Sequence, residues 1–556
     1  MRRKQKDAVR LIPLEDRPGP NPRAFAAPGP WEDLQSRFRW DIPAFFSIAE
    51  ACCDAWARAA PDRVALTEPG GTKREWSYGD LKAASDRLAN ALRARGIGRG
   101  DRVAILLPQC AEVLITHFAV MKLGAVVLPL FTLFGVEALR FRLEDSGAAA
   151  LVTDPENLEK AMALVPDLPE MRLVLVTGRA PSSATAFWAT LEAASGAFSP
   201  APIAADDPAM LIYTSGTTGP PKGALHAHRF LIGHLPSVEL QHEFLPRNGD
   251  CGWTPADWAW IGGLMDLAMP CLYHGVRLVA HRMRKFDPEA AYDLIAQERV
   301  RNLFLPPTAL KLMRQAALPA GIDIRSIASG GESLGADLLT WGRDVLGAPI
   351  NEIYGQTECN LVVSTCHGAM QVRPGTMGKA VPGHEVAILD MHGKPVAPGR
   401  SGEICVRMPN PVMFLGYWKR PEDTLEKVRD GWLRTGDLGS CDEEGYFTFQ
   451  SRDDDVINSA GYRIGPNEIE NCLLGDRDVT MSAVIGVPDP VRGEVIVAYV
   501  VIRDDAERRG LEDRLAGRVR EKLSPHMAPR QVRVVESLPM TATGKIMRRA
   551  LRERDD

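Results

Sequence analysis

Short apolar runs alternate with helix-like stretches over the first third of the chain. The clearest segments are three strand-like runs, RVAILL (102–107), VVLPL (126–130) and AAALVTD (148–154), and one helix-like stretch, AEVLITHFAVMKLGA (111–125). Alternation of this kind predicts parallel strands covered by helices. Before them, a Pro-rich leader to about residue 40 is expected to be loose.

The pattern changes twice toward the C-terminus. An Ala-, Ser- and Pro-rich stretch (178–207), expected to be a surface connection, leads to the strand-like run AMLIYT (209–214). Shorter, turn-punctuated runs such as SGEICVR (401–407) and GYFTFQSRDDDVINSAGYRIG (445–465) predict a β-rich closing portion of a large domain. Beyond about residue 455 the segments suit a small α+β domain, in which one apolar helix face is expected at Leu511, Leu515, Val519 and Leu523.

Composition is that of an ordinary globular protein. The 556 residues are 45% hydrophobic and 25% charged, which favours two or more domains. With 66 basic and 71 acidic residues the net charge is -5, so no global basic field indicates nucleic acid as a partner, and an anionic ligand must be held locally. No apolar run reaches the roughly 18 residues of a membrane span. The ten cysteines lack zinc or redox spacing, which predicts reduced, mostly buried thiols and a cytoplasmic location.

The stretch YTSGTTGPPKGALHAH (213–228) concentrates groups that can hold a polyphosphate. Such a loop needs inward-facing backbone N–H groups, close approach without Cβ atoms, hydroxyl donors and a mobile cation. The candidates are Thr214, Ser215, Gly216, Thr217, Thr218, Gly219, Lys222 and Gly223. Lys222 is followed by Gly rather than Ser or Thr, so the loop is not of the Walker type. From composition alone, a plain Gly/Pro turn stays open, and His226 and His228 are expected to be packing or helix-surface residues rather than metal ligands.

Five further motifs follow this loop. They are SGGESL (329–334), YGQTE (354–358), RTGDLG (434–439), SRDDDVINSAGYRIGPNEIE (451–470) and PMTATGKIMRRAL (539–551). In this order they resemble the signatures of the acyl-adenylate-forming superfamily, which includes acyl-CoA synthetases, adenylation domains of peptide synthetases and luciferases. The resemblance spans nearly the whole chain and implies a ligase that uses ATP and Mg²⁺.

The resemblance also implies roles for individual residues. Thr214 to Lys222 would hold the β- and γ-phosphates of ATP, Thr357 would contact the α-phosphate, and Glu358 would bind Mg²⁺. The nucleotide would be bound by a further set of residues: Gly331, Glu332, Ser333, Tyr354, Gly355 and Gln356 around adenine, Asp437 on the ribose hydroxyls, and Arg452 and Arg463 on ribose and phosphates. Taken alone, Glu358 could be a solvated loop carboxylate, Tyr354 a core residue and Arg463 a surface cation.

Lys545 is the catalytic candidate that the resemblance singles out, because its ammonium could bridge the incoming carboxylate and the α-phosphate. The alternative is one more cation in a basic tail. The resemblance implies an α/β fold with a large domain (1–453) of β-sheets layered with helices plus a β-rich portion, and a small mobile α+β domain (455–556). Asp454 matches the hinge, and Gly461 matches the segment that lines the pantetheine tunnel.

The identity of the acid is the least determined point. Acetyl-CoA synthetases of the superfamily have Trp where this chain has Gly355, so we expect a pocket for a medium-chain, branched or aromatic acid. Its other walls would be Trp260, Ile261, Gly262 and Gly330, unless the tryptophans only pack. Coenzyme A is the expected acceptor. The alternatives are a ligase that loads a carrier protein, a luciferase-like oxygenation and a non-catalytic nucleotide-binding regulator. A lysine acetyltransferase acting on Lys545 and a homo-oligomer are further possible partners.

Overall fold

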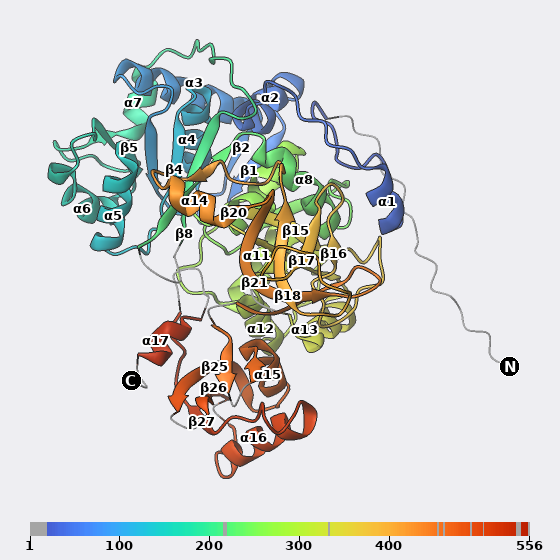
Figure 1. Ribbon diagram of the computed structural model, residues 1–556. Helices are drawn as coiled ribbons and strands as arrows, with labels where there is room; N and C mark the ends of the chain where they lie inside the picture. The colour runs from blue at the N-terminus through green and yellow to red at the C-terminus, as the bar shows by residue number, and fades with distance from the viewer. Residues whose placement is uncertain are drawn as a thin grey trace.

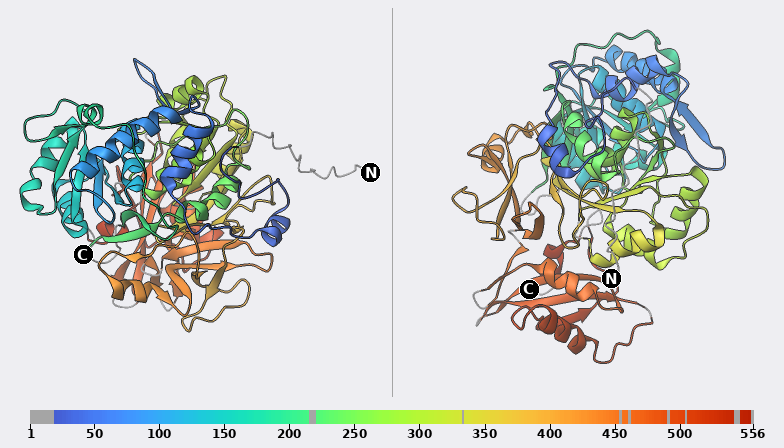
Figure 2. Two further views of the ribbon diagram at one scale, coloured as in Figure 1. Left: turned by 90° about the horizontal axis from the view of Figure 1, so that it is seen from above. Right: turned by 90° about the vertical axis from the view of Figure 1, so that its right-hand side faces the viewer.

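The computed structural model describes residues 19–214, 220–331, 334–452, 455–459, 462–489, 492–503, 505–540 and 546–553. A large body carries three β-sheets with their helices, and a small C-terminal domain carries a fourth sheet (Figure 1). In the right-hand view of Figure 2 the small domain, coloured orange to red, lies below the rest of the molecule. The predicted α/β class, with a large layered domain followed by a small α+β domain, is confirmed.

The first large sheet has eight strands. Their order is β19 (Gly416–Tyr417), β9 (Lys222–Ala227), β8 (Pro208–Thr214), β4 (Val126–Pro129), β3 (Arg102–Leu106), β5 (Ala148–Thr153), β6 (Leu173–Val176) and β7 (Thr185–Ala186). β3 pairs in parallel with both β4 and β5, as the alternating pattern predicts. The two-residue strand β19 comes from far along the chain and covers the edge of β9 in antiparallel orientation.

The second large sheet has nine strands. Their order is β16 (Lys379–Ala380), β15 (Cys359–Ser364), β14 (Ile350–Gln356), β13 (Ser326–Gly330), β12 (Asn302–Phe304), β10 (Cys251–Trp253), β11 (Arg277–Val279), β1 (Val64–Glu68) and β2 (Arg74–Ser77). β10, β12, β13 and β14 run parallel, so their carboxyl ends meet at one edge. In open α/β sheets ligands bind at this edge.

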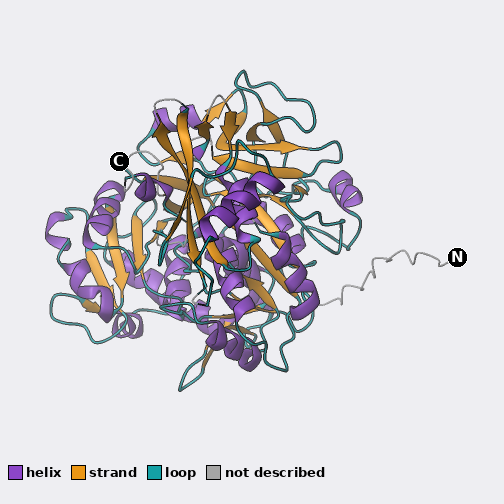
Figure 3. Ribbon diagram, turned by 90° about the horizontal axis from the view of Figure 1, so that it is seen from below, coloured by secondary structure: helices purple, strands orange, loops and turns teal. Residues whose placement is uncertain are grey.

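Helices cover these sheets, as Figure 3 shows with helices in purple and strands in orange. They are α3 (Tyr78–Ala94), α4 (Ala111–Lys122), α5 (Val136–Ser146), α6 (Pro155–Met162), α8 (Phe230–Gln241), α11 (Pro288–Glu298), α12 (Pro307–Gln315) and α13 (Ala336–Trp341). α4 is buried along its whole length and packs in one core with Val103 of β3 and Leu66 of β1, so it joins the two large sheets. α3 begins in a capping box, in which Ser77 and Asp80 satisfy each other's backbone N–H groups.

The β-rich portion and the small domain follow. The antiparallel third sheet contains β17 (Val386–Leu389), β18 (Gly402–Arg407), β20 (Val428–Arg429), β21 (Trp432–Cys441) and β22 (Phe447–Arg452), and α14 (Pro421–Lys427) lies beside it. The small domain contains β23 (Ile457–Ser459), β24 (Tyr462–Ile464), β25 (Val479–Asp489), β26 (Gly493–Ile502), β27 (Gln531–Val534), α15 (Pro466–Leu474), α16 (Leu511–Lys522) and α17 (Arg548–Arg552). The segment 445–465, expected to close the large domain, is therefore divided between the two sheets.

Residues 19–40 do not form the loose segment that the sequence predicts. From residue 19 onward the chain is described, and α1 (Trp31–Arg37) buries Trp31 completely. The carboxylate of buried Glu239 accepts the backbone N–H groups of Ala24 and Phe25 at 2.7 and 3.1 Å. The prediction of a loose leader to residue 40 is thus wrong, because contacts with Glu239, more than 200 positions away, fix the backbone at Ala24 and Phe25. The surface connection 178–207 likewise includes β7 and the helix α7 (Phe187–Ala193).

Other expectations concern cysteines, histidines and membranes. All ten cysteines are free, and eight of them are buried. His226 and His228 are fully buried, which confirms the expectation that they are packing residues. Burial lowers the pKa of His226 to about 3 and that of His228 to about 4, so both are neutral. No helix in the described part of the chain has the length and apolar character needed to cross a bilayer.

Candidate active site

The predicted phosphate loop connects two antiparallel strands. β8 ends at Thr214 and β9 begins at Lys222, and these two residues are cross-strand partners. The Thr214 hydroxyl donates to the Lys222 carbonyl at 3.3 Å. The loop leads into a strand and not into the N-terminus of a helix, which confirms that it is not of the Walker type.

Lys222 already has an anionic partner within the protein. Its Nζ donates to Oδ1 of Asp423, on α14, at 2.8 Å. The same ammonium lies 5.3 Å from the centre of the Tyr417 ring, on β19. Lys222 is therefore held at the mouth of the loop by two residues that the sequence analysis does not single out.

Thr357 and Glu358 form the turn between β14 and β15, in which Gln356 pairs with Cys359. Gly355 precedes this turn at an irregular point of the ladder. A Cβ atom built on Gly355 would lie 2.3 Å from the backbone N of Leu361, so the returning strand passes too close for any side chain. The absence of a side chain at position 355 is thus required by backbone packing.

A hydrogen-bond network centres on the buried carboxylate of Asp437, on β21. Its Oδ2 accepts from the Tyr354 hydroxyl and from Gln356 Nε2, both at 2.7 Å, and its Oδ1 lies 3.3 Å from Nη1 of Arg452. Gln356 Nε2 also donates to the Thr435 carbonyl at 2.8 Å. The structure therefore joins four predicted nucleotide-binding residues, with Tyr354 and Gln356 about 80 positions from Asp437.

The state of Asp437 bears on its predicted role. Burial raises its pKa, while the positive charge of Arg452 opposes that shift. A carboxylate has about four acceptor positions, and three donors from the protein already point at this one. To accept both ribose hydroxyls, Asp437 would have to release at least one of these partners.

Glu358 has a carboxylate suited to a metal ion. It is 8% exposed, and its Oε1 accepts the hydroxyl of Tyr417. Among the described residues no cluster of three or more His, Cys, Asp or Glu side chains could hold a metal. Mg²⁺ in nucleotide sites is commonly bound by one or two carboxylates plus phosphate oxygens. One buried carboxylate beside the phosphate loop fits that mode of binding.

Replacing Tyr417 by phenylalanine is expected to loosen Glu358 without unfolding the protein. A hydrogen bond to a charged group contributes about 1.5–3 kcal/mol, so we expect a loss of about 10-fold or more in kcat/KM for ATP and a higher Mg²⁺ requirement. Steady-state rates over a range of Mg²⁺ concentrations measure this. The control is Tyr446→Phe, which removes a hydroxyl that donates to the Gln371 carbonyl at 2.7 Å. Equal Mg²⁺ requirements in the two variants would contradict the role.

The predicted acyl-pocket residues gather at the carboxyl ends of β12, β13 and β14. Gly262 lies between two rings, since a Cβ atom there would be 3.0 Å from Trp260 and 3.1 Å from Phe304. The rings of Trp260 and Phe304 are 5.6 Å apart. A Cβ atom on Gly330 would lie 2.7 Å from the Ile353 carbonyl. These glycines allow close packing, so they do not by themselves indicate empty space, and the pocket assignment stays a prediction.

Several predicted residues cannot be placed. Those outside the described residues are Ser215, Gly216, Thr217, Thr218, Gly219, Glu332, Ser333, Asp454, Gly461 and Lys545. Arg463 lies in β24, of which the backbone is described but not this side chain. Gly331, with φ +94°, follows the end of β13 next to the β14 strand that carries Tyr354.

Sequence reasoning missed the segment 416–427. Tyr417 and Asp423 contact the predicted residues, and Lys427 Nζ donates to the Thr435 carbonyl at 3.0 Å. The available signal is the run GYWKRPED (416–423), which combines aromatic and charged residues. Nothing in that run says that it lies beside Lys222, 201 positions away.

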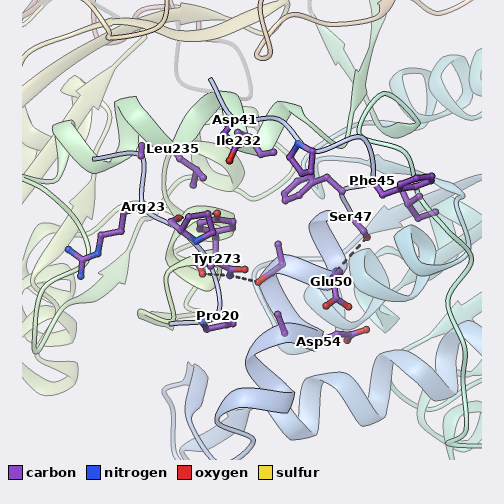
Figure 4. Close-up of a pocket in the computed structure, with 18 of the residues that line it drawn as sticks. Pro20, Arg23, Asp41, Phe45, Ser47, Glu50, Asp54, Ile232, Leu235 and Tyr273 are labelled. Atoms are coloured by element: carbon purple, nitrogen blue, oxygen red, sulfur yellow. Dashed lines mark hydrogen bonds between the residues drawn. The ribbon is translucent and has the colours of Figure 1, made fainter. Parts of the chain in front are cut away.

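A cavity of about 900 Å³ lies elsewhere, between the N-terminal segment and the helices η1 (Glu50–Asp54), α2 (Ala55–Ala59) and α8 (Figure 4). Phe45, Glu50, Asp54 and Tyr273 are among the residues that line it. None of the residues predicted for the nucleotide or the acid lines this cavity. It is therefore separate from the candidate active site.

Comparisons with known proteins agree with this geometry. The family of AMP-binding enzymes matches residues 53–418, and the AMP-binding enzyme C-terminal domain matches residues 468–545. Acetyl-coenzyme A synthetase of Bacillus subtilis (strain 168) is 34% identical over 508 residues, which cover 88% of this chain and 87% of that protein. The mitochondrial acyl-coenzyme A synthetase ACSM2 of Rattus norvegicus is 33% identical over 536 residues, with 93% and 92% covered.

A solved structure gives the same result. The anthranilate CoA ligase AuaEII, in complex with anthranoyl-AMP, superposes with a TM-score of 0.85 at 26% identity. The match covers 92% of this chain and 98% of that one. The likeness thus extends over both the large body and the small domain.

Proposed function

Because the chain belongs to the AMP-binding enzyme family and is an AMP-forming acid–thiol ligase of the acyl-CoA synthetase group, we propose that it activates a medium-chain, branched or aromatic acid through an acyl-AMP intermediate. The acyl group is then transferred to coenzyme A. The observation that carries the proposal is the assembly of Lys222, Glu358, Tyr354 and Asp437 in one region of the large domain. These residues come from three sheets, so the fold brings a cation and two carboxylates from distant parts of the chain together.

Adenylation brings together two anions, the carboxylate and the α-phosphate. Two unit charges 4 Å apart interact by about 4 kcal/mol at an effective dielectric near 20. In the proposed step a carboxylate oxygen attacks the α-phosphorus, the bond to the bridging oxygen breaks, and pyrophosphate leaves. Lys222 binds the departing phosphates, and Lys545 neutralises the charge between the two reactants. Glu358 would hold Mg²⁺, which would supply further neutralisation of the phosphate oxygens.

The second step takes place at a different atom, the carbonyl carbon of the acyl-AMP, and needs different machinery. The thiol sulfur attacks that carbon, its proton is released, and AMP leaves with the bonding electrons. A lysine at the reaction centre would obstruct the thiol. We propose that the small domain (455–556) rotates about Asp454 between the two steps, withdraws Lys545 and brings the Gly461 segment to the pantetheine arm.

Two observations support an acid larger than acetate. Trp260 and Phe304 offer aromatic faces beside Gly262. AuaEII, whose structure holds anthranoyl-AMP, shows that this fold accommodates an aromatic acyl group. An apolar wall favours longer acids by about 0.8 kcal/mol for each methylene that it buries.

A panel of carboxylic acids with ATP, Mg²⁺ and coenzyme A tests the proposal. AMP release should be fastest with a medium-chain, branched or aromatic acid, and kcat/KM should rise about 3- to 4-fold for each methylene added up to the limit of the pocket. Acetate is the control. If acetate is the best substrate, the proposed acid class is wrong although the ligase activity stands. Adenylation of the acid without thioester formation on coenzyme A would instead favour a carrier-protein acceptor.

A further inference from the structure

We propose that Asp423 is an internal counter-ion that occupies Lys222 in the absence of nucleotide and is exchanged for the phosphates of ATP. This inference rests on the proposed function, since it assigns ATP to the loop at Lys222. Asp423 is a positioning residue, because it acts through Lys222 and not on the reacting atoms. The 2.8 Å contact between Lys222 Nζ and Asp423 Oδ1 carries the proposal.

The pair is placed for exchange. The Lys222 and Asp423 side chains are 27% and 30% exposed, so water and a ligand can reach both. Lys222 begins β9 directly after the predicted phosphate loop, which puts the ammonium where polyphosphate is expected to bind. An ion pair of this exposure is weak, so a ligand with several negative charges can displace the carboxylate.

Asp423 has a second cation to which it can turn. Arg420 Nη1 lies 3.8 Å from Asp423 Oδ2, on the oxygen that Lys222 does not use. The Thr424 hydroxyl accepts the Tyr417 N–H at 2.8 Å and donates to the Arg420 carbonyl at 2.9 Å, which fixes this segment. When Lys222 binds the phosphates instead, Asp423 therefore still has Arg420 as a neighbouring cation.

Lys222 also keeps a contact through the exchange. Its ammonium rests over the face of the Tyr417 ring, and the hydroxyl of that ring donates to Glu358. A cation over an aromatic face is stabilised whether its anionic partner is a carboxylate or a phosphate. Tyr417 thus links Lys222 to Glu358, the candidate Mg²⁺ ligand, both before and after ATP replaces Asp423.

The test compares Asp423→Asn with Glu426→Gln, which removes one negative charge from an exposed part of the same helix, where Glu426 lies 3.8 Å from Arg429. Binding of ATP and of adenosine to the full chain is measured by calorimetry. Asp423→Asn should bind ATP about 2- to 5-fold more tightly than the wild type, the range of a partly exposed ion pair. Adenosine, which has no phosphate, should bind equally to both. Glu426→Gln should leave both ligands unchanged.

A double variant separates exchange from simple repulsion. In a Lys222→Ala background, Asp423→Asn should no longer tighten ATP binding, because the Lys222 ammonium that the substitution would free from Asp423 is absent. Tightening that persists there would overturn the proposal, since it would come from repulsion between Asp423 and the phosphates. An unchanged ATP affinity in Asp423→Asn would also overturn it. If the wild type binds neither ATP nor adenosine, the proposed function itself fails.

Discussion

Lys545→Ala is expected to slow acyl-adenylate formation by about 10²- to 10³-fold, as removal of a comparable transition-state donor does. The measurement is exchange of labelled pyrophosphate into ATP, driven by the best acid of the panel. Folding should be unaffected, because the substitution shortens one side chain in the small domain. The second half-reaction should be preserved, because the proposed rotation withdraws Lys545 before coenzyme A reacts. Thioester formation from chemically prepared acyl-AMP measures that step.

The arginines of α17, which follows Lys545 in the sequence, form ion pairs within the small domain. Arg548 lies 2.8 Å from Glu470 and 3.2 Å from Asp455, and Arg552 lies 2.9 Å from Asp455. These arginines hold α17 against the rest of the small domain. Met540 and Ile546 form an isolated β-bridge. Helix α17 is therefore fixed to the rest of the small domain by ion pairs.

The control for Lys545 is Lys522→Ala, which removes an exposed ammonium at the end of α16. It should retain full pyrophosphate exchange. Undiminished exchange in Lys545→Ala would exclude the catalytic assignment. An equal loss in both half-reactions would contradict the withdrawal of Lys545 between the two steps.

Of all the proposed substitutions, Lys122→Met is expected to lower the stability of the fold most. Lys122 Nζ lies 2.7 Å from Asp54 and 2.6 Å from Asp86, and it donates to Ser85 at 2.9 Å. The three ionic side chains are 1%, 5% and 4% exposed. Removing one member of a buried ion pair lowers stability by about 3–5 kcal/mol, because the remaining charge is uncompensated. Urea unfolding followed by tryptophan fluorescence should show the lower midpoint.

The loss of stability in Lys122→Met should depend on pH. Burial raises the pKa of Asp54, and the charge of Lys122 opposes that shift. A carboxyl whose folded pKa lies above its unfolded value stabilises the fold at low pH and loses this contribution as the pH rises past the folded pKa. Without Lys122 the upward shift of the Asp54 pKa is larger, so the loss of stability in the variant should shrink as the pH falls through that raised pKa.

Lys82→Met is the matched control, because Lys82 also pairs with Asp86 but is 34% exposed. It should destabilise the protein far less. The double variant Lys122→Met/Asp54→Asn should recover part of the loss. A deficit that is independent of pH, and that the second substitution does not relieve, would show that packing and not charge determines it.

Local patterns in the sequence predicted much of the scaffold. The run 102–107 became β3, 126–130 became β4, and the helix-like stretch 111–125 contains α4. The secondary structure of these segments was predicted correctly because it follows the local spacing of apolar residues. The end of the strand-like run 209–214 was also predicted correctly, since β8 ends at Thr214.

What the sequence could not show are contacts between distant segments. The N-terminal segment looks loose by composition, yet it is fixed by Glu239, 215 positions from Ala24. Asp423 carries no sign that its partner is Lys222. A Cβ atom at Gly330 or Gly355 would meet the backbone of Ile353 or Leu361, a close approach that the residue type alone does not reveal. In each case the deciding atom belongs to a strand or helix whose position depends on the whole fold.

The strand β19 imposes an order on how this protein can be made. β9 emerges from the ribosome long before residues 416–417, and at 5–20 residues per second the interval is roughly 10 to 40 s. Until β19 arrives, the backbone groups along that edge of β9 have no strand to pair with, and open edges recruit other chains. A messenger truncated before codon 416 would therefore yield a product with a permanently exposed edge, prone to aggregation.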